Sequence, residues 1–321
     1  MKLDELFQKY RSRLINWMKS VLHIGCIAGV PQTLAMAQRK EGLTSDVLAF
    51  GTNPFRYDAD YSYPTTWHFP LNYVQKILIL FKMAKQYEMF HFHYNSIAPF
   101  GLDFPFYKMS VKKIIMHHHG SDIRGKSEKF LYSKFAHQIF VSTPDLLEWS
   151  PNAVWIPNPI DLESFPYIGI KKKSSIINIV HAPTNRARKG TKHVIRAVEN
   201  LKREGYKVHL SLIENIPHSE VIDYYKKADI VVDQLLIGWY GVLAVEAIAL
   251  GKPVCVYIRD DLESYMPFMP FFNTSLNNIT ENLRNLIESE KLRTELGIRG
   301  REYVEQMHNS RDVARKVIQY Y

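Results

Sequence analysis

One carboxylate stands out in the second half of the chain. Between residues 242 and 250 every side chain is apolar except that of Glu246. A helix that is apolar on all sides is buried on all sides, and a buried carboxylate costs on the order of several kcal/mol unless a partner compensates it. Glu246 therefore needs a specific partner. A pair of ligand hydroxyls and a structural salt bridge both meet this need, and the residue alone does not decide between them.

The start of the same predicted helix favours an anion. Gly238 and Gly241 precede it, and glycine lets the backbone approach a ligand closely. The amides of Gly241 and Val242 open the helix, and a helix N-terminus attracts negative charge. A phosphate at this end and a ribose near Glu246 would together fit one nucleotide.

A basic turn predicts a second anion-binding element. Arg186, Arg188 and Lys189 follow a predicted strand at residues 176–181 and precede a predicted helix at residues 191–204. Two or three cations beside a helix N-terminus can hold a diphosphate without a metal ion. We expect Arg186 and Lys189 to bind and Arg188 to point outward. A solvated basic turn is the alternative interpretation.

The elements that must position these residues alternate between strands and helices. In the first half, strands are predicted at residues 21–26, 46–50, 89–93, 113–116, 137–141 and 154–157, with helices at 30–39 and 71–87 and an aromatic loop at 51–70. After Pro157, Pro159 and Pro166 the alternation restarts, with strands at 176–181, 208–213, 230–233 and 253–258. Short apolar strands separated by helices indicate parallel sheets with helices on both faces.

This pattern predicts an α/β protein of two Rossmann-like domains whose parallel sheets face each other across a cleft. We place the first domain at residues 1–165, with an extra helix at residues 3–20, and the second at residues 166–305. Ligands of open α/β sheets bind beyond the carboxyl ends of the strands. The chemistry is therefore expected in the loops that follow the strands.

Charge and composition exclude some classes of partner. The 321 residues carry a formal charge of +9, spread about evenly along the chain. A nucleic-acid clamp would concentrate its charge, so we expect no nucleic acid as partner. The charge suits phosphate-bearing ligands or an anionic membrane. The basic helix at residues 3–20 lies either on such a membrane or on its own domain.

The two cysteines, Cys26 and Cys255, lie in or beside predicted apolar strands. Their number and spacing indicate no disulfide framework and no zinc motif, so we expect both to be reduced. No stretch of about 18 apolar residues predicts a membrane span, and the expected compartment is the cytoplasm.

Five segments resemble the retaining glycosyltransferases of family 4, in particular a bacterial and archaeal type that builds surface glycans. The resemblance covers roughly residues 21–321, is strongest in the second domain, and implies the GT-B fold. The segments are residues 119–122 (His-Gly-Ser-Asp), 157–161 (Pro-Asn-Pro-Ile-Asp), 181–191, 216–229 and 238–253.

The resemblance implies roles in binding a nucleotide-sugar donor. Glu246 falls where the second Glu of the family's Glu-x7-Glu element holds the ribose hydroxyls, and Arg186 and Lys189 fall where cations hold the diphosphate. Backbone amides that would contact the donor belong to Tyr240, Gly241, Val242 and Leu243. Gly25 and Gly29 lie in the first strand–helix turn, which would approach the phosphates.

The resemblance also implies candidate catalytic residues in the first domain. His119 falls near the reacting sugar, and Asp122 is expected to orient it or to bind acceptor hydroxyls. A C-terminal helix at residues 306–321 would cross back onto the first domain.

Two further features of the first domain can be interpreted in more than one way. Imidazoles at strand ends can bind a metal, and His91, His93 and residues 117–119 are placed in this way. No carboxylate or cysteine spacing completes a recognisable site, so we favour residues that line a cleft and expect no metal. The aromatic loop at residues 57–69 either stacks on sugars or packs on itself.

The function implied is the transfer of a sugar from a nucleoside-diphosphate sugar to a hydroxyl of a glycan or lipid-linked acceptor. It would proceed with retention, with no cofactor and no metal, in the cytoplasm or at the cytoplasmic face of a membrane. One residue departs from the family pattern, because Gly238 stands where the first Glu would contact the donor sugar. A non-catalytic nucleotide-sugar-binding or scaffold protein, and a GT-B epimerase or hydrolase, are the alternatives.

Overall fold

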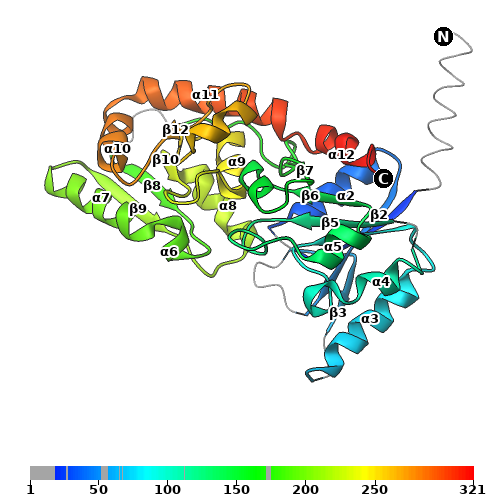
Figure 1. Ribbon diagram of the computed structural model, residues 1–321. Coiled ribbons are helices and arrows are strands. Elements are labelled where there is room, and N and C mark those ends of the chain that lie inside the picture. The colour runs from blue at the N-terminus through cyan, green and yellow to red at the C-terminus, as the bar shows by residue number, and fades with distance from the viewer. Residues whose placement is uncertain are drawn as a thin grey trace, which may run out of the picture. The chain divides into compact units, whose positions relative to one another are not determined.

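A computed structural model describes residues 19–26, 28–51, 57–64, 66, 68–111, 113–170 and 175–321. The helix predicted at residues 3–20, with its membrane contact, lies almost entirely outside the described residues, and so does Trp67 of the aromatic loop. The chain forms two compact units, Met1–Pro159 with Ser310–Tyr321 and Ile160–Asn309. Figure 1 shows both units as α/β structures.

The unit boundaries differ by a few residues from the positions 165 and 305 expected from the sequence. Ile160 forms a parallel bridge with Asn309, and its amide donates to the carbonyl of His308. These bonds join the first and the last residues of the second unit. Residues 160–165 consequently stay with the second unit, and the last helix begins at Ser310.

The first unit contains a seven-stranded sheet in which all neighbouring strands are parallel. The sheet order is β3-β2-β1-β4-β5-β6-β7. The strands are β1 Ser20–Ile24, β2 Thr44–Phe50, β3 Tyr61–Tyr63, β4 Met89–His93, β5 Lys113–His118, β6 Gln138–Val141 and β7 Val154–Trp155. The strand order changes direction between β1 and β4. The loops after these two strands diverge there, and open α/β sheets bind their ligands at such a point.

In the first unit the strand β3 was not predicted, because residues 51–70 were assigned to a loop. β3 pairs with β2, and Asp60 just before it accepts a hydrogen bond from the amide of Val47. The segment Tyr-Ser-Tyr is too short to show a strand period. Its pairing depends on the free edge of β2, which only the assembled sheet provides.

Helices cover both faces of this sheet. They are α2 Val30–Lys40, α3 Leu71–Met83, α4 Phe104–Tyr107, α5 Phe130–Phe135 and α12 Ser310–Ile318, with short 3-10 turns η1 Pro99–Gly101 and η2 Pro144–Glu148. Leu22, Phe90 and Met116 pack toward the side of α3, α4 and α5. Their neighbours Val21 and Met89 pack toward α2 and α12, as the alternation of side chains along a strand requires.

The second unit is built around a five-stranded parallel sheet of order β12-β11-β10-β8-β9. Its strands are β8 Ile177–His181, β9 Val208–Leu212, β10 Ile230–Val232, β11 Val254–Val256 and β12 Phe272–Asn273. Its helices are α6 Arg186–Lys189, α7 Thr191–Arg203, α8 His218–Lys227, α9 Val242–Ala249, α10 Ile279–Glu288 and α11 Glu290–Met307, with the 3-10 turn η3 Asp260–Tyr265.

α9 is the buried helix expected from its apolar sequence, with seven of its residues buried, Glu246 among them. α11 lies against it because two glycines leave room. A methyl group at Gly297 would lie 2.2 Å from the carbonyl oxygen of Gly251, and one at Gly300 would lie 2.8 Å from the Cβ of Ile248. These contacts fix the position of α9 in the unit.

α12 belongs to the first unit, where it packs on α2. Val313, Ala314 and Val317 join its core, and Glu41 at the end of α2 accepts hydrogen bonds from Arg311 and Arg315. Among the described residues, no helix is both long enough and apolar enough to cross a membrane.

Candidate functional site

Glu246 has a protein partner. The residue is 5% exposed, and its Oε1 lies 2.7 Å from Nε2 of His218, the first residue of α8. Burial lowers the pKa of His218, but the hydrogen bond and the charge of Glu246 together raise it above the ordinary value. The two side chains therefore form an ion pair when His218 is protonated. The sequence analysis required a partner for Glu246 but did not identify His218.

Asp233 connects two of the expected anion-binding residues. It follows β10 directly and is 1% exposed. Its Oδ2 accepts a 2.6 Å hydrogen bond from the amide of Gly241, and its Oδ1 accepts a 2.5 Å hydrogen bond from Nζ of Lys189. The start of α9 and the cation at the end of α6 thus converge on one carboxylate. This is the geometry by which they would hold any anion of similar size.

The role of Asp233 as a common partner of Lys189 and Gly241 was not predicted from the sequence. The signal that could have found this role is its position at the carboxyl end of a buried strand. An acidic residue there faces the loops of the neighbouring βα units.

The remaining basic residues of α6 are exposed. Asn185 caps this short helix by accepting from the amide of Arg188. Arg186 forms a two-point ion pair with Glu214, its Nε donating to Oε1 at 2.8 Å. Arg188 is also exposed. Lys189 is thus the basic residue of α6 that the fold brings to the start of α9, whereas Arg186 is directed to a carboxylate after β9.

The buried side-chain amide of Gln234 holds the loop before α9. Gln234 donates to the carbonyl oxygens of Trp239 and Tyr257 and accepts from the amides of Leu236 and Ile237. Its four hydrogen bonds define the path of the loop. The sequence offered no signal for this residue beyond its place after β10.

Gly238, the departure from the family pattern, lies in this loop. It has a φ of +89°, and a methyl group there would lie 2.5 Å from Cδ of Arg259. Arg259 is held in turn by a two-point ion pair with Asp261. A side chain at position 238 would require both a strained backbone and a displaced Arg259.

The four consecutive residues expected to offer backbone amides differ in their surroundings. The ring of Tyr240 is buried, and its hydroxyl hydrogen-bonds to Tyr303 and His308. Gly241 and Val242 are partly exposed, whereas Leu243 is buried. The amide of Gly241 is the one that bonds to Asp233.

Gly25 and Gly29 lie where the chain turns from β1 into α2. Gly25 has a φ of +110°, and a methyl group there would lie 2.9 Å from the carbonyl oxygen of His93. Gly29 begins α2 with a φ of +70° and packs against the ring of Tyr57. A positive φ and close contacts within the first unit account for glycine at both positions.

Asp122 organises the loop after β5. Its Oδ1 accepts hydrogen bonds from the amides of His119 and Gly120, and its Oδ2 lies 2.6 Å from Nδ1 of His118. Burial lowers the pKa of His118, but Asp122 and Glu128 together raise it above the ordinary value. Asp122 thus holds the backbone of His119, while its side-chain partner is His118.

The ring of His119 has both nitrogens engaged. Nε2 lies 3.0 Å from Nδ1 of His93, and Nδ1 lies 2.7 Å from Oγ of Ser142. Burial is the main cause that lowers the pKa of His119 to about 4. The imidazole is therefore neutral near pH 7, and its ring would have to exchange one of these bonds to contact a ligand.

A prediction concerns the pair of His218 and Glu246. Because the pKa of His218 is raised in the folded state, the pair stabilises the fold fully below the unfolded pKa of about 6.5. This contribution is lost as pH rises through the folded pKa. Chemical denaturation should show that the wild type is more stable than His218→Gln at low pH, and that this difference in the free energy of unfolding narrows at alkaline pH.

The exposed histidine variant His209→Gln is the matched control. A gap between the wild type and His218→Gln that stays constant from acid to alkaline pH would contradict the assignment.

Comparisons with known proteins agree with this architecture. No protein-family model and no curated protein sequence matches the chain. A sucrose-phosphate synthase from Thermosynechococcus elongatus is similar in structure, with a TM-score of 0.66 and 16% identity over 94% of this chain and 98% of that one. An alpha-glucosyltransferase in complex with UDP and a mismatched DNA gives a TM-score of 0.67 and 12% identity, with coverage of 94% and 98%.

The catalytic domain of Starch Synthase IV from Arabidopsis thaliana, bound to ADP and acarbose, gives a TM-score of 0.66 and 11% identity, again with coverage of 94% and 98%. Identities this low establish the fold alone. The chain has the α/β fold of GT-B glycosyltransferases, with a parallel sheet in each unit.

Proposed function

We propose that this chain is a glycosyltransferase that moves a sugar from a nucleoside-diphosphate sugar to an acceptor hydroxyl. The observation that carries the proposal is the convergence of Lys189 and the amide of Gly241 on the carboxylate of Asp233. These two donors, one cationic and one at a helix N-terminus, suit an anionic oxygen. The fold adds support, since similar structures hold UDP or ADP.

The donor diphosphate binds at the start of α9, where its charge competes with Asp233 for the same donors. Lys189 and the helix N-terminus then stabilise the negative charge that develops on the leaving diphosphate. Glu246 lies one helical turn beyond Val242, on the same side of α9. A carboxylate is an acceptor only, and so it suits the two hydroxyls of a ribose.

The finer part of the proposal is a retaining transfer of the family 4 type, with no metal required for the diphosphate. His119 lies near the reacting sugar in this scheme, and Asp122 holds its backbone. Because the ring nitrogens of His119 bond to His93 and Ser142, the residue acts as a neutral contact for the sugar and not as a proton donor.

A second function is favoured by Gly238. The chain lacks a carboxylate at this position, and the stem of Arg259 lies where one would begin. Such a site would bind a nucleotide-sugar without transferring it, or would hydrolyse or epimerise the donor. Product analysis with the donor that binds, over a broad panel of acceptors, separates free sugar, altered donor and unchanged donor from a glycosylated product.

The acceptor we propose is a growing surface glycan or a lipid-linked sugar at the cytoplasmic face of a membrane. η1, α4 and α5 lie together in the first unit and expose Phe100, Phe106 and Phe130, and Met109 just after α4 is exposed as well. Lys108 directly after α4 and Lys134 in α5 are exposed too, and so is Lys126 in the loop before α5. Apolar side chains beside cations suit the surface of an anionic bilayer.

Membrane contact can be tested by flotation with vesicles of phosphatidylglycerol and phosphatidylcholine. We expect the double variant Phe100→Ser/Met109→Ser, and separately a deletion of residues 1–20, to float less than the wild type. Ile176→Ser/Ile298→Ser removes exposed apolar side chains of the second unit and should float normally. If all four proteins float equally, the membrane contact is wrong.

The role of Lys189 can be tested by donor binding. A thermal-shift screen with UDP-, GDP-, ADP- and dTDP-sugars identifies the nucleotide, since a bound donor stabilises the fold by mass action. Lys189→Gln should then weaken binding by about 10-fold or more, because a charge-assisted hydrogen bond contributes roughly 1.5–3 kcal/mol. Lys192→Gln, an exposed lysine on the neighbouring helix, is the control, and equal binding by both variants would remove the assignment.

The proposed contact between Glu246 and the ribose predicts that replacing Glu246 removes the preference for a ribonucleotide over its 2′-deoxy analogue. Wild-type protein should bind the ribonucleoside diphosphate more tightly than its 2′-deoxy analogue, since the analogue leaves a buried carboxylate with one hydroxyl fewer. Glu246→Gln should bind both nucleotides with similar affinity. Calorimetric titration of the two nucleotides against both proteins measures the difference, and an unchanged preference in the variant would show that Glu246 serves His218 alone.

A further inference from the structure

A group of histidines covers one face of the central strands in the first unit. His23 on β1 is the register partner of His91 on β4, and His93 is the register partner of His117 on β5. These side chains point to the face covered by α2 and α12, as Val21 and Met89 do. Most of this face is apolar, so several adjacent imidazoles there call for a physical reason.

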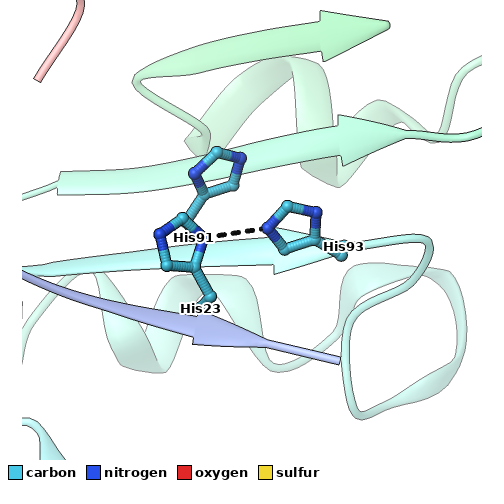
Figure 2. Close-up of side chains that lie close together, drawn as sticks. All are labelled: His23, His91 and His93. Carbon is cyan, nitrogen blue, oxygen red and sulfur yellow. Dashed lines mark hydrogen bonds between the residues drawn. The ribbon is translucent and has the colours of Figure 1, made fainter. Parts of the chain in front are cut away.

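Three of them form a compact set, His23, His91 and His93 (Figure 2). Their relative exposures are 0%, 0% and 2%. One nitrogen from each ring lies within 4.8 Å of the others. Nδ1 of His23 is 2.9 Å from Nε2 of His93, the contact drawn as a dashed line in Figure 2, and the rings of His91 and His93 stack at 4.4 Å.

His91 contributes a buried nitrogen that lacks a partner. Within the described part of the chain, its Nε2 has no hydrogen-bond partner although it is inaccessible to solvent. A buried polar atom without a partner costs about 1–3 kcal/mol. A ligand that accepts electron density from this nitrogen would remove the cost.

The other nitrogen of each ring already has a hydrogen-bond partner of the kind that metal-bound histidines use. Nε2 of His23 lies 2.9 Å from Oε1 of Gln38, and Nδ1 of His91 lies 2.7 Å from the hydroxyl of Tyr321. Nδ1 of His93 lies 3.0 Å from Nε2 of His119. Such outer partners fix the tautomer and the orientation of a ligating imidazole.

We propose that His23, His91 and His93 form a binding site for a divalent transition metal of the zinc class. Imidazole nitrogens suit Zn²⁺, Cu²⁺ and Ni²⁺, and burial keeps all three imidazoles neutral by lowering each pKa. The metal takes the lone pairs of His23 Nδ1, His91 Nε2 and His93 Nε2. A fourth position belongs to water or hydroxide, as in other three-histidine zinc sites.

Metal binding needs a small adjustment between His23 and His93, whereas the ring of His91, which stacks on that of His93 at an interplanar angle of 15°, must turn so that its Nε2 points to the metal. Zinc–nitrogen bonds of about 2.0–2.1 Å in tetrahedral geometry separate the two nitrogens by roughly 3.3 Å, against 2.9 Å between His23 and His93. The metal replaces the hydrogen bond between His23 and His93, and the proton of that bond moves to the other nitrogen of its ring, so that each neutral imidazole carries its one proton on the nitrogen that faces Gln38, Tyr321 or His119. The site would tie β1 and β4 to Tyr321 after α12, and it stands apart from the glycosyl transfer proposed above.

A neighbouring set, His93, His117 and His119, also brings three ring nitrogens within 4.8 Å. Its outer partners are less complete, because His117 Nε2 and His119 Nδ1 both bond to the single hydroxyl of Ser142. We therefore assign the site to the first set. His23 and His91 belong only to that set, and His117 belongs only to the neighbouring one, so variants separate the two.

The experiment titrates the chelator-treated full chain with Co²⁺, followed by its visible absorption, and with Zn²⁺ by calorimetry. We expect one tight site per chain with the spectrum of tetrahedral nitrogen ligation. His91→Gln and His23→Gln should weaken Zn²⁺ binding by at least about 100-fold, and Tyr321→Phe by about 10-fold as the loss of an outer partner. His117→Gln and the exposed His137→Gln should bind as the wild type does.

Circular dichroism of each metal-free variant shows whether it is folded. X-ray absorption at the zinc edge identifies the ligand atoms in the wild type and therefore needs no variant. Three imidazole ligands support the proposal. Loss of binding in His117→Gln but not in His91→Gln would overturn the assignment in favour of the neighbouring set. Absence of a tight site in the wild type, or of imidazole ligands in its spectrum, would overturn the proposal, and neither result bears on the donor-binding tests.

Discussion

The carboxylate of Asp233 holds the candidate donor site together. It is almost fully buried, and it accepts hydrogen bonds from the ammonium of Lys189 and from the first amide of α9. Without it, a cation and the positive end of a helix would face each other at close range with nothing to compensate them. This charged contact helps to fix α9 relative to α6 and β10, together with the hydrogen bond from the amide of Leu235 to the carbonyl oxygen of Lys189. A ligand phosphate suits the same place for the same electrostatic reason.

Packing behind α9 makes this contact possible. Gly297 and Gly300 let α11 approach α9 to within backbone contact, and the amide of Gln234 fixes the loop that leads into α9. α9 then carries Glu246 into a buried position, where His218 balances its charge. The same packing of α9 therefore buries Glu246 and leaves the N-terminus of the helix partly exposed.

The first unit also buries polar side chains, and there they are a group of imidazoles. His23, His93 and His119 bond to one another in sequence, between Gln38 at one end and Ser142 at the other. Polar groups in a protein interior are costly unless such partners are present. The network therefore orients His119 at the end of β5, and His91 is left with a nitrogen that no described residue satisfies. Both units thus bury a histidine–carboxylate pair, His118 with Asp122 and His218 with Glu246, and the first unit adds a chain of neutral rings.

Local pattern was enough for much of the fold. Short apolar strands between amphipathic helices predicted parallel α/β sheets, and the isolated acid in an apolar run marked Glu246 as a residue in need of a partner. The short strand Tyr61–Tyr63 was not predictable, because its pairing depends on the edge of β2. The domain boundaries were displaced, because the bonds of Ile160 to His308 and Asn309 join residues far apart in the sequence.

The sequence by itself determined the longer strands and helices of the alternating pattern, that Glu246 is buried, and that Lys189 stands at the mouth of a βα turn. Only the tertiary structure decided the partners. In the folded protein Glu246 pairs with His218, Lys189 with Asp233, and Arg186 with Glu214. The reason is physical: secondary structure follows from local periodicity and backbone sterics. The partner of a buried charge is set by which strand ends the sheet order brings together, and no local pattern encodes that order.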